Sequence, residues 1–163
     1  MPIPCVPENA VAKLIIDSCA NSFAACRGDC NRFLKAALGP FLADGYLDGL
    51  DADEIVGKLQ GPGEGWTASR DIKTAIARAK AGDVVIAGMT SKALAQKHGH
   101  VAVVVGCDGQ QSGETIVPLG YAGALDNPAA QLDGGRLSGT FPATLVRTSG
   151  LDYYCKTPDR VPD

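Results

Sequence analysis

Histidine, tryptophan and long apolar runs are scarce in this chain of 163 residues, which has two histidines and one tryptophan. No apolar run reaches the ~18 residues of a membrane-spanning helix, and the N-terminus lacks the basic start and long apolar core of a signal peptide. The 15 basic residues are scattered among 18 acidic ones, so the chain lacks the basic patch of a nucleic-acid-binding protein. We therefore expect no nucleic-acid partner and no membrane insertion.

Cysteine is abundant by comparison, with six residues in the chain. None of them forms a Cys-x-x-Cys pair, and with only His98 and His100 as further ligands a zinc site would need irregular spacings. We therefore expect no metal and no other cofactor. One or two disulfides are the remaining explanation, such as a bond from Cys5 or Cys19 to Cys155, in a protein that reaches an oxidising compartment.

The first half of the chain has the apolar spacing of helices. Apolar residues three and four positions apart predict a helix over residues 9–23. Asp29 is suited to cap a second helix, and residues 51–54 resemble the capping box that begins a third. Ser69 is expected to cap a fourth helix.

After residue 82 the pattern changes to β-branched runs, which predict strands at residues 83–88 and 100–107. A turn cluster then predicts that residues 115–121 pair antiparallel with the second strand. Residues 126–139 read as a loop, and residues 144–155 predict a last strand. Helices followed by an antiparallel sheet are typical of an α+β fold, and the length fits one domain over residues 1–163.

A cysteine stands where a polar loop becomes an apolar helix, in the sequence Gly28-Asp29-Cys30-Asn31. The thiolate is the nucleophilic form of cysteine, and the free N–H groups and positive dipole at a helix start favour it. The same N–H groups can stabilise the oxyanion of acyl transfer, with Asp29 and Asn31 as neighbouring candidates. Cys30 is therefore a candidate nucleophile; the alternative is a buried, unreactive thiol.

His100 begins the β-branched run 100–107 and is the candidate base, which takes the thiol proton and returns it to the leaving amine. The alternative is a polar residue at a strand end. Trp66 follows the flexible loop 61–65, and such loops often border a binding cleft. It is a candidate cleft residue, with a core or rim anchor as the alternative.

Three stretches look like the signatures of the NlpC-type cell-wall peptidases, which are papain-like in their core. They open a helix, a strand and the next strand, with the sequences DCNRF at residues 29–33, GDVV at residues 82–85 and GHVAV at residues 99–103. The resemblance implies N-terminal helices packed on a central antiparallel sheet. It also implies that Cys30 attacks an amide carbon while His100 acts as base and then acid.

A closer similarity links the chain to the amidase effectors of type VI secretion, over most of residues 10–125. It rests on IIDSC at residues 15–19, VIAG at 85–88, HVAVV at 100–104 and YAGA at 121–124. Such effectors are toxins that the type VI apparatus injects into the periplasm of rival bacteria, so no signal peptide is needed. The resemblance implies cleavage of peptidoglycan peptides, with the third effector group and its diaminopimelate–D-alanine cross-link as the nearest pattern. It further implies a cognate immunity protein that blocks the cleft.

Papain-like enzymes orient the histidine through a third polar group, usually on the following strand. The predicted hairpin sets residues 118–121 opposite His100, and none of these is Asn, Asp or His. A backbone carbonyl or Asp126 in the next loop is the remaining candidate. His98 is a rival base, but the Gly-His-Val-Ala-Val match favours His100.

Two other functions are compatible with the sequence. A housekeeping endopeptidase would use the same chemistry on the producer's own wall, and the lack of a signal peptide argues against it. A catalytically silent cell-wall binding module, stapled by disulfides, would instead pair Cys30 with Cys26 or Cys19.

Overall fold

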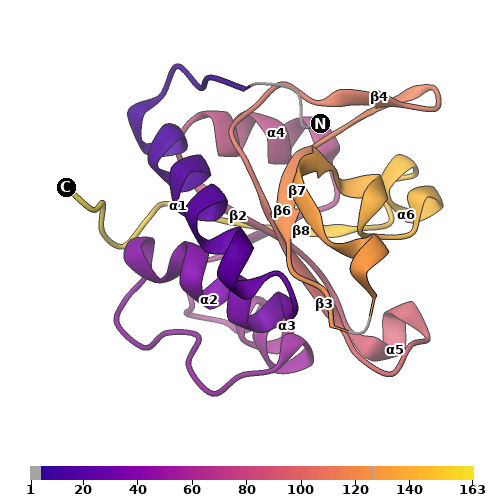
Figure 1. Ribbon diagram of the computed structural model, residues 1–163, viewed down its shortest axis with the longest axis horizontal. Helices are drawn as coiled ribbons and strands as arrows, with labels where there is room; N and C mark the ends of the chain where they lie inside the picture. Colours follow the sequence, from indigo (N-terminus) through magenta and orange to yellow (C-terminus); the bar gives the residue numbers. More distant parts are fainter. Residues whose placement is uncertain (1–4, 126) are drawn as a thin grey trace.

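Six strands form one antiparallel sheet in the order β1-β8-β2-β3-β6-β7 (Figure 1). The computed structural model describes residues 5–125 and 127–163. Helices pack on the sheet, so the α+β class predicted from the sequence is confirmed. The strands of this sheet are β1 (Thr67–Ser69), β2 (Val84–Met89), β3 (His100–Val104), β6 (Leu119–Ala122), β7 (Leu132–Arg136) and β8 (Asp152–Lys156), and β4 (Gln110–Ser112) and β5 (Thr115–Val117) form a separate hairpin.

The helices are concentrated in the first half of the chain. Among the described residues, no helix has the length and apolar character needed to cross a membrane. The α-helices are α1 (Ala10–Cys26), α2 (Cys30–Leu38), α3 (Ala52–Gln60), α4 (Ile72–Lys80), α5 (Ser91–Leu94) and α6 (Ala143–Arg147), and the short 3₁₀ turns are η1 (Gly39–Phe41), η2 (Pro128–Ala130) and η3 (Leu137–Gly139).

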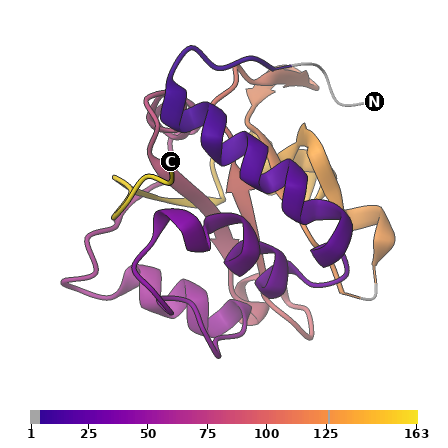
Figure 2. The ribbon, with the colours of Figure 1, turned by 60° about the vertical axis from the view of Figure 1, so that its left-hand side comes forward.

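Successive residues of the central strand β2 point to opposite faces of the sheet. Val84 and Ile86 pack with α1, α2 and α3, whereas Val85 and Ala87 pack with α4 and α6. Figure 2 shows α1, α2 and α3 together on one face. Because helices cover both faces, every residue of β2 is buried, which explains its uninterrupted apolar sequence.

Three of the predicted helix starts are confirmed, the first of them at α1, which Asn9 caps. Asp29 caps α2, and Asp51 forms a capping box with Glu54 at the start of α3. The prediction for the fourth helix is wrong by two residues, because Ser69 ends β1 and Asp71 caps α4.

The second half of the chain departs from the prediction in its strands. The segment predicted as a loop contains β7, whose adjacent glycines hide it because glycine is uncommon in strands. Residues 144–155 begin in helix α6, and only their end belongs to β8. The predicted strand 115–121 is divided, since β5 pairs with β4 and β6 pairs with β3.

The pairing of β6 with β3 also corrects the predicted hairpin register. Val103 lies opposite Tyr121 and Val104 lies opposite Gly120, so continuing this register brings His100 level with Ala124. Residues 118–121 are therefore not opposite His100. The register differs because the separate β4–β5 hairpin uses residues that the prediction assigned to a turn and to the paired strand.

A disulfide joins Cys5 to Cys107, just beyond the end of β3. The expected bond to Cys155 is wrong, since Cys19 and Cys155 are both free. Cys19 packs on the α1 face of the sheet and Cys155 on the α4 face. The sheet separates the two thiols.

Candidate active site

Cys30 is the first residue of α2 and is held there by the cap that precedes it. The Asp29 carboxylate accepts hydrogen bonds from the amides of Asn31 at 2.8 Å and Arg32 at 3.2 Å. Phe33, in the same turn, is fully buried and fixes the helix start in the core. Cys30 is 8% exposed, and its exposed part borders a cavity.

The thiol of Cys30 is free, as are those of Cys19 and Cys26. The binding-module alternative required Cys30 to be paired with one of these two, and the structure contradicts that pairing. Cys26 is also 8% exposed. It is not among the described residues that line the cavity beside Cys30.

His100 opens β3, where it pairs with Met89 of β2. The residue before it, Gly99, is buried, and a Cβ atom there would collide with the Asp53 carboxylate and the Met89 carbonyl. Only glycine permits this close approach of the strand start to α3. This close approach at Gly99 fixes the backbone at the start of β3, from which the His100 side chain extends.

Cys30 and His100 line the same cavity, which has a volume of about 330 Å³. The backbone amide of Val101, the residue after His100, is close enough to the Cys30 sulfur to lower the pKa of the thiol. The starts of helix α2 and strand β3 therefore border one cavity, which the two residues that the sequence marked as nucleophile and base both line.

Burial raises the pKa of the Cys30 thiol, and the charge of Asp29 acts in the same direction. The amides of Val101, Asn31 and Cys30 itself each lower that pKa by less than burial raises it, and the pKa stays above its ordinary value. The expected thiolate at the helix start is therefore opposed by burial and by the charge of the cap. The resting thiol donates to Oδ1 of Asn31 at 3.4 Å.

The first turn of α2 offers fewer N–H groups for an oxyanion than the sequence indicated. The Asp29 carboxylate occupies the amides of Asn31 and Arg32, and the Asp29 carbonyl accepts from the amide of Phe33. The Cys30 amide and the side-chain amide of Asn31 are then the candidate donors beside the sulfur. Asp29 acts as the cap and cannot donate as a carboxylate.

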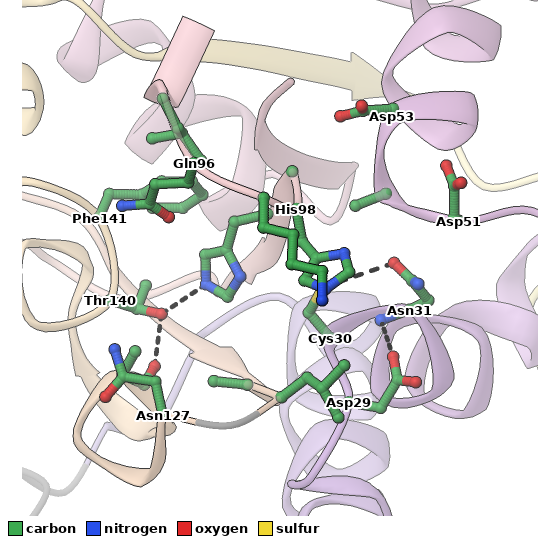
Figure 3. A pocket seen from close by; sticks show the side chains of 18 of the residues that line it. Asp29, Cys30, Asn31, Asp51, Asp53, Gln96, His98, Asn127, Thr140 and Phe141 are labelled. Atoms are coloured by element: carbon green, nitrogen blue, oxygen red, sulfur yellow. Dashed lines mark hydrogen bonds between the residues drawn. The ribbon is translucent and has the colours of Figure 1, made fainter. Parts of the chain in front are cut away.

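Thr140 supplies a polar contact to His100 that the sequence did not indicate. Its hydroxyl oxygen lies 2.6 Å from Nε2 of His100 and 2.5 Å from the carbonyl oxygen of Ala130 (Figure 3). Burial lowers the pKa of His100 to about 4, so the imidazole is neutral at pH 7. Thr140 follows η3, in a segment whose sequence carries no periodic pattern that marks it.

Two further candidates from the sequence are His98 and Asp126. His98 lines the same cavity from an exposed position ahead of β3, and Asp126 lies outside the described residues. Sequence reasoning missed Asp51, Asp53 and Lys97, which also line the cavity. They give it acidic groups on the α3 side and a basic group on the segment before β3.

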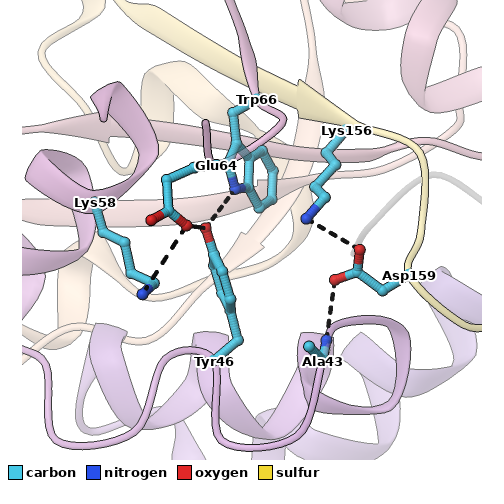
Figure 4. A network of polar contacts seen from close by, with 7 residues as sticks. All are labelled: Ala43, Tyr46, Lys58, Glu64, Trp66, Lys156 and Asp159. Atoms are coloured by element: carbon cyan, nitrogen blue, oxygen red, sulfur yellow. Dashed lines mark hydrogen bonds and ion pairs between the residues drawn. The ribbon is translucent and has the colours of Figure 1, made fainter. Parts of the chain in front are cut away.

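Trp66 is placed in a separate network (Figure 4). Its Nε1 donates to the hydroxyl of Tyr46 at 2.9 Å, and that hydroxyl donates to the Glu64 carboxylate at 2.6 Å. The ammonium of Lys156 lies 5.7 Å from the centroid of the Trp66 ring. Trp66 is not among the described residues that line the cavity, and it packs, partly buried, against the core, as the anchor alternative expects.

Comparison with known proteins assigns no family to the chain. No protein-family model matches it, and no curated protein matches it. Within residues 5–125 and 127–163, no group of three His, Cys, Asp or Glu side chains is arranged to hold a metal ion. A functional assignment therefore rests on the geometry around Cys30 and His100 and on the motif resemblance.

Proposed function

We propose that the chain is a cysteine amidase of papain-like, NlpC-type architecture, with Cys30 as nucleophile and His100 as base. The observation that carries this proposal is the position of both side chains on one cavity, where α2 meets β3. A helix that begins with the nucleophile and packs on an antiparallel sheet bearing the base is also the arrangement that the motif resemblance implies.

Acylation starts with a proton transfer inside the cavity. The neutral imidazole of His100 takes the proton from the Cys30 sulfur as the thiolate attacks the amide carbon. The C–N bond then breaks while His100 returns the proton to the leaving amine, which leaves a thioester on Cys30. Water deprotonated by His100 attacks this thioester, and the carboxylic acid and the free thiol are released.

The tetrahedral intermediate needs hydrogen-bond donors beside the sulfur. The cap binds the two amides that follow Cys30, so the Cys30 amide is the proposed backbone donor. The side chain of Asn31 contacts the sulfur through Oδ1 in the resting state, and rotation of its amide would present the NH₂ group. One such donor contributes about 10²- to 10³-fold in rate.

The proposed substrate is the peptide part of peptidoglycan in rival bacteria, and the bond is the diaminopimelate–D-alanine cross-link. The resemblance to type VI amidase effectors supports this choice. The cavity adds support, since Asp51, Asp53 and Lys97 give it charges of both signs, suited to a peptide with free amine and carboxylate groups. The type VI apparatus and an immunity protein that covers the cavity are the proposed partners, and the periplasm of the target cell is the proposed place of action.

The test is digestion of purified peptidoglycan sacculi, followed by mass spectrometry of the released fragments. The wild-type chain is expected to release peptides cut at the cross-link, and Cys30→Ala is expected to release none. Cys26→Ala is the matched control, because it removes an equally buried free thiol that does not line the cavity. Undiminished cleavage by Cys30→Ala would refute the proposal, as would an inactive wild-type chain.

The place of action has its own test, which also separates an exported toxin from other roles. Expression with an added periplasmic signal is expected to lyse a Gram-negative host, whereas expression of the unaltered chain in the cytoplasm is expected to leave growth normal. The periplasmic form of Cys30→Ala should be harmless. Equal growth with the periplasmic wild-type and Cys30→Ala forms would contradict a toxic role.

A further inference from the structure

The hydroxyl of Thr140 lies between a group that can donate or accept a hydrogen bond and a group that can only accept one. One is Nε2 of His100, 2.6 Å away, and the other is the backbone carbonyl oxygen of Ala130, 2.5 Å away. Both contacts are within hydrogen-bonding distance. Thr140 lines the cavity together with Cys30 and His100, but it belongs to the chain segment after η3.

The number of hydrogen atoms available to these two contacts determines which group donates in each. A hydroxyl group has one hydrogen, and a carbonyl oxygen can only accept. Thr140 therefore donates its hydrogen to Ala130 and accepts from His100, which requires a hydrogen on Nε2 of His100. A neutral imidazole carries a single N–H, so Nδ1 of His100 keeps a free lone pair.

We propose that Thr140 is the positioning residue of the catalytic pair, which holds His100 in the tautomer whose Nδ1 is free to accept the Cys30 proton. The catalytic role of Thr140 in this inference rests on the proposed function. The assignment of the tautomer rests on the contacts alone. Thr140 acts through His100 and touches no reacting atom.

The packing around the imidazole supports this role. Phe141 contacts the ring edge-on, with centroids 4.9 Å apart and an angle of 62° between the planes. The aromatic ring and the hydroxyl thus come from adjacent residues and restrict both the tilt and the rotation of His100. Because a threonine hydroxyl has no formal charge, it orients the imidazole without providing the negative charge that would stabilise an imidazolium.

Two substitutions separate the hydroxyl from the shape of the side chain. Thr140→Val keeps the volume and removes the hydroxyl, whereas Thr140→Ser keeps the hydroxyl. The chain has only two histidines, so ¹⁵N-labelled imidazole resonances at pH 7 can be assigned with a single His98→Gln reference. Wild type and Thr140→Ser are expected to show His100 protonated at Nε2, and Thr140→Val is expected to show a mixture of tautomers.

Kinetics on sacculi give the second readout. Thr140→Val is expected to lower kcat by on the order of 10²-fold, the usual contribution of a well-placed base, with KM nearly unchanged. Thr140→Ser is expected to stay within about threefold of wild type, because it retains the contact that orients the base.

The two readouts distinguish failure of this inference from failure of the proposed function. A wild-type His100 protonated at Nδ1 would overturn the inference, and so would a Thr140→Val variant that keeps the wild-type tautomer and kcat. If Thr140→Val fails to fold, loss of the Nε2 proton in Thr140→Ser would overturn it equally. A wild-type chain without amidase activity but with the expected tautomer would support the contact while refuting the proposed function.

Discussion

The Asp53 carboxylate accepts two hydrogen bonds from Ser91, one from its amide at 2.6 Å and one from its hydroxyl at 2.5 Å. Asp53 lies in α3, and Ser91 begins α5. Most of residues 92–98 are exposed, and Lys97 and His98 in this segment line the cavity. The Asp53–Ser91 contact therefore anchors the start of a segment that borders the candidate active site.

Asp53→Ala removes the acceptor of both bonds. We expect the free energy of unfolding to fall by about 1 to 3 kcal/mol, the usual result of leaving partly buried donors without an acceptor. Amide hydrogen exchange should also become faster in residues 91–98. Asp17→Ala is the control, because Asp17 pairs with Lys13 at an exposed site and such pairs contribute about 0 to 1 kcal/mol. Unchanged exchange in residues 91–98 would show that the contact does not hold the segment.

The charge of Asp29 raises the pKa of the Cys30 thiol, and this effect can be removed without removing the helix cap. Asparagine caps helices about as well as aspartate, so Asp29→Asn should leave the stability nearly unchanged. We expect the pH midpoint for alkylation of Cys30 by iodoacetamide to move to lower pH, as measured by peptide mass spectrometry. Asp29→Ala should lower the midpoint too, while costing about 1 kcal/mol of stability. An unshifted midpoint in both variants would refute the effect of the charge.

The Cys5–Cys107 disulfide closes a loop with a sequence separation of 102 residues. A loop of this length limits the unfolded chain strongly, so the chain-entropy model gives a stabilisation of up to about 4.7 kcal/mol. We expect Cys107→Ser to lower the melting temperature and to make it independent of reductant. Cys155→Ser is the control, since Cys155 is a free thiol and its variant should still lose stability when reductant is added. A wild-type melting temperature that does not respond to reductant would contradict the prediction.

The pKa of His100 is lowered from 6.5 to about 4 by burial, which makes the folded state sensitive to acid. Between these two values the unfolded chain binds a proton that the folded chain does not. This part of the stability is therefore complete above pH 6.5 and is lost as the pH falls to 4, by up to about 3 kcal/mol at 1.36 kcal/mol per unit.

His100→Gln tests this dependence, because glutamine can still donate to Thr140 but does not titrate. The free energy of unfolding, measured with denaturant at pH 7 and pH 4.5, should fall less with acid in the variant than in wild type. Carboxylates contribute to acid unfolding in both proteins, so the difference between the two losses isolates His100. Equal losses would show that His100 is not buried in its neutral form.

The predictions that the structure confirms rest on patterns within a few neighbouring residues. Asp29 and Asp51 were identified as caps because a cap acts on the amides of the next turn. Strand β2 was identified because a strand covered on both faces has a continuous apolar sequence. Cys30 and His100 were selected by their positions at the starts of α2 and β3 and by the motif resemblance; both line one cavity, and their catalytic roles stay predictions.

Features that depend on distant parts of the chain were missed. Thr140 contacts His100 across 40 residues, and neither its neighbours nor its spacing marks it. The pairing of Cys5 depends on which face of the sheet each thiol reaches, which no spacing reveals. Strand β7 was missed because its glycines lower the local preference for a strand, and its pairing with β6 provides the compensation.

Strand β8 lies between β1 and β2 in the sheet, although it follows every other strand of the sheet in the sequence. A ribosome-bound chain that ends before residue 152 already contains Cys30, His100 and Thr140. One edge of β2 is then unpaired, and the core residues that pack against Tyr153 and Tyr154 have no partner. Because β8 supplies one of the two pairing edges of β2 and a buried tyrosine to each core cluster, completion of the sheet depends on a segment far along the chain from Cys30.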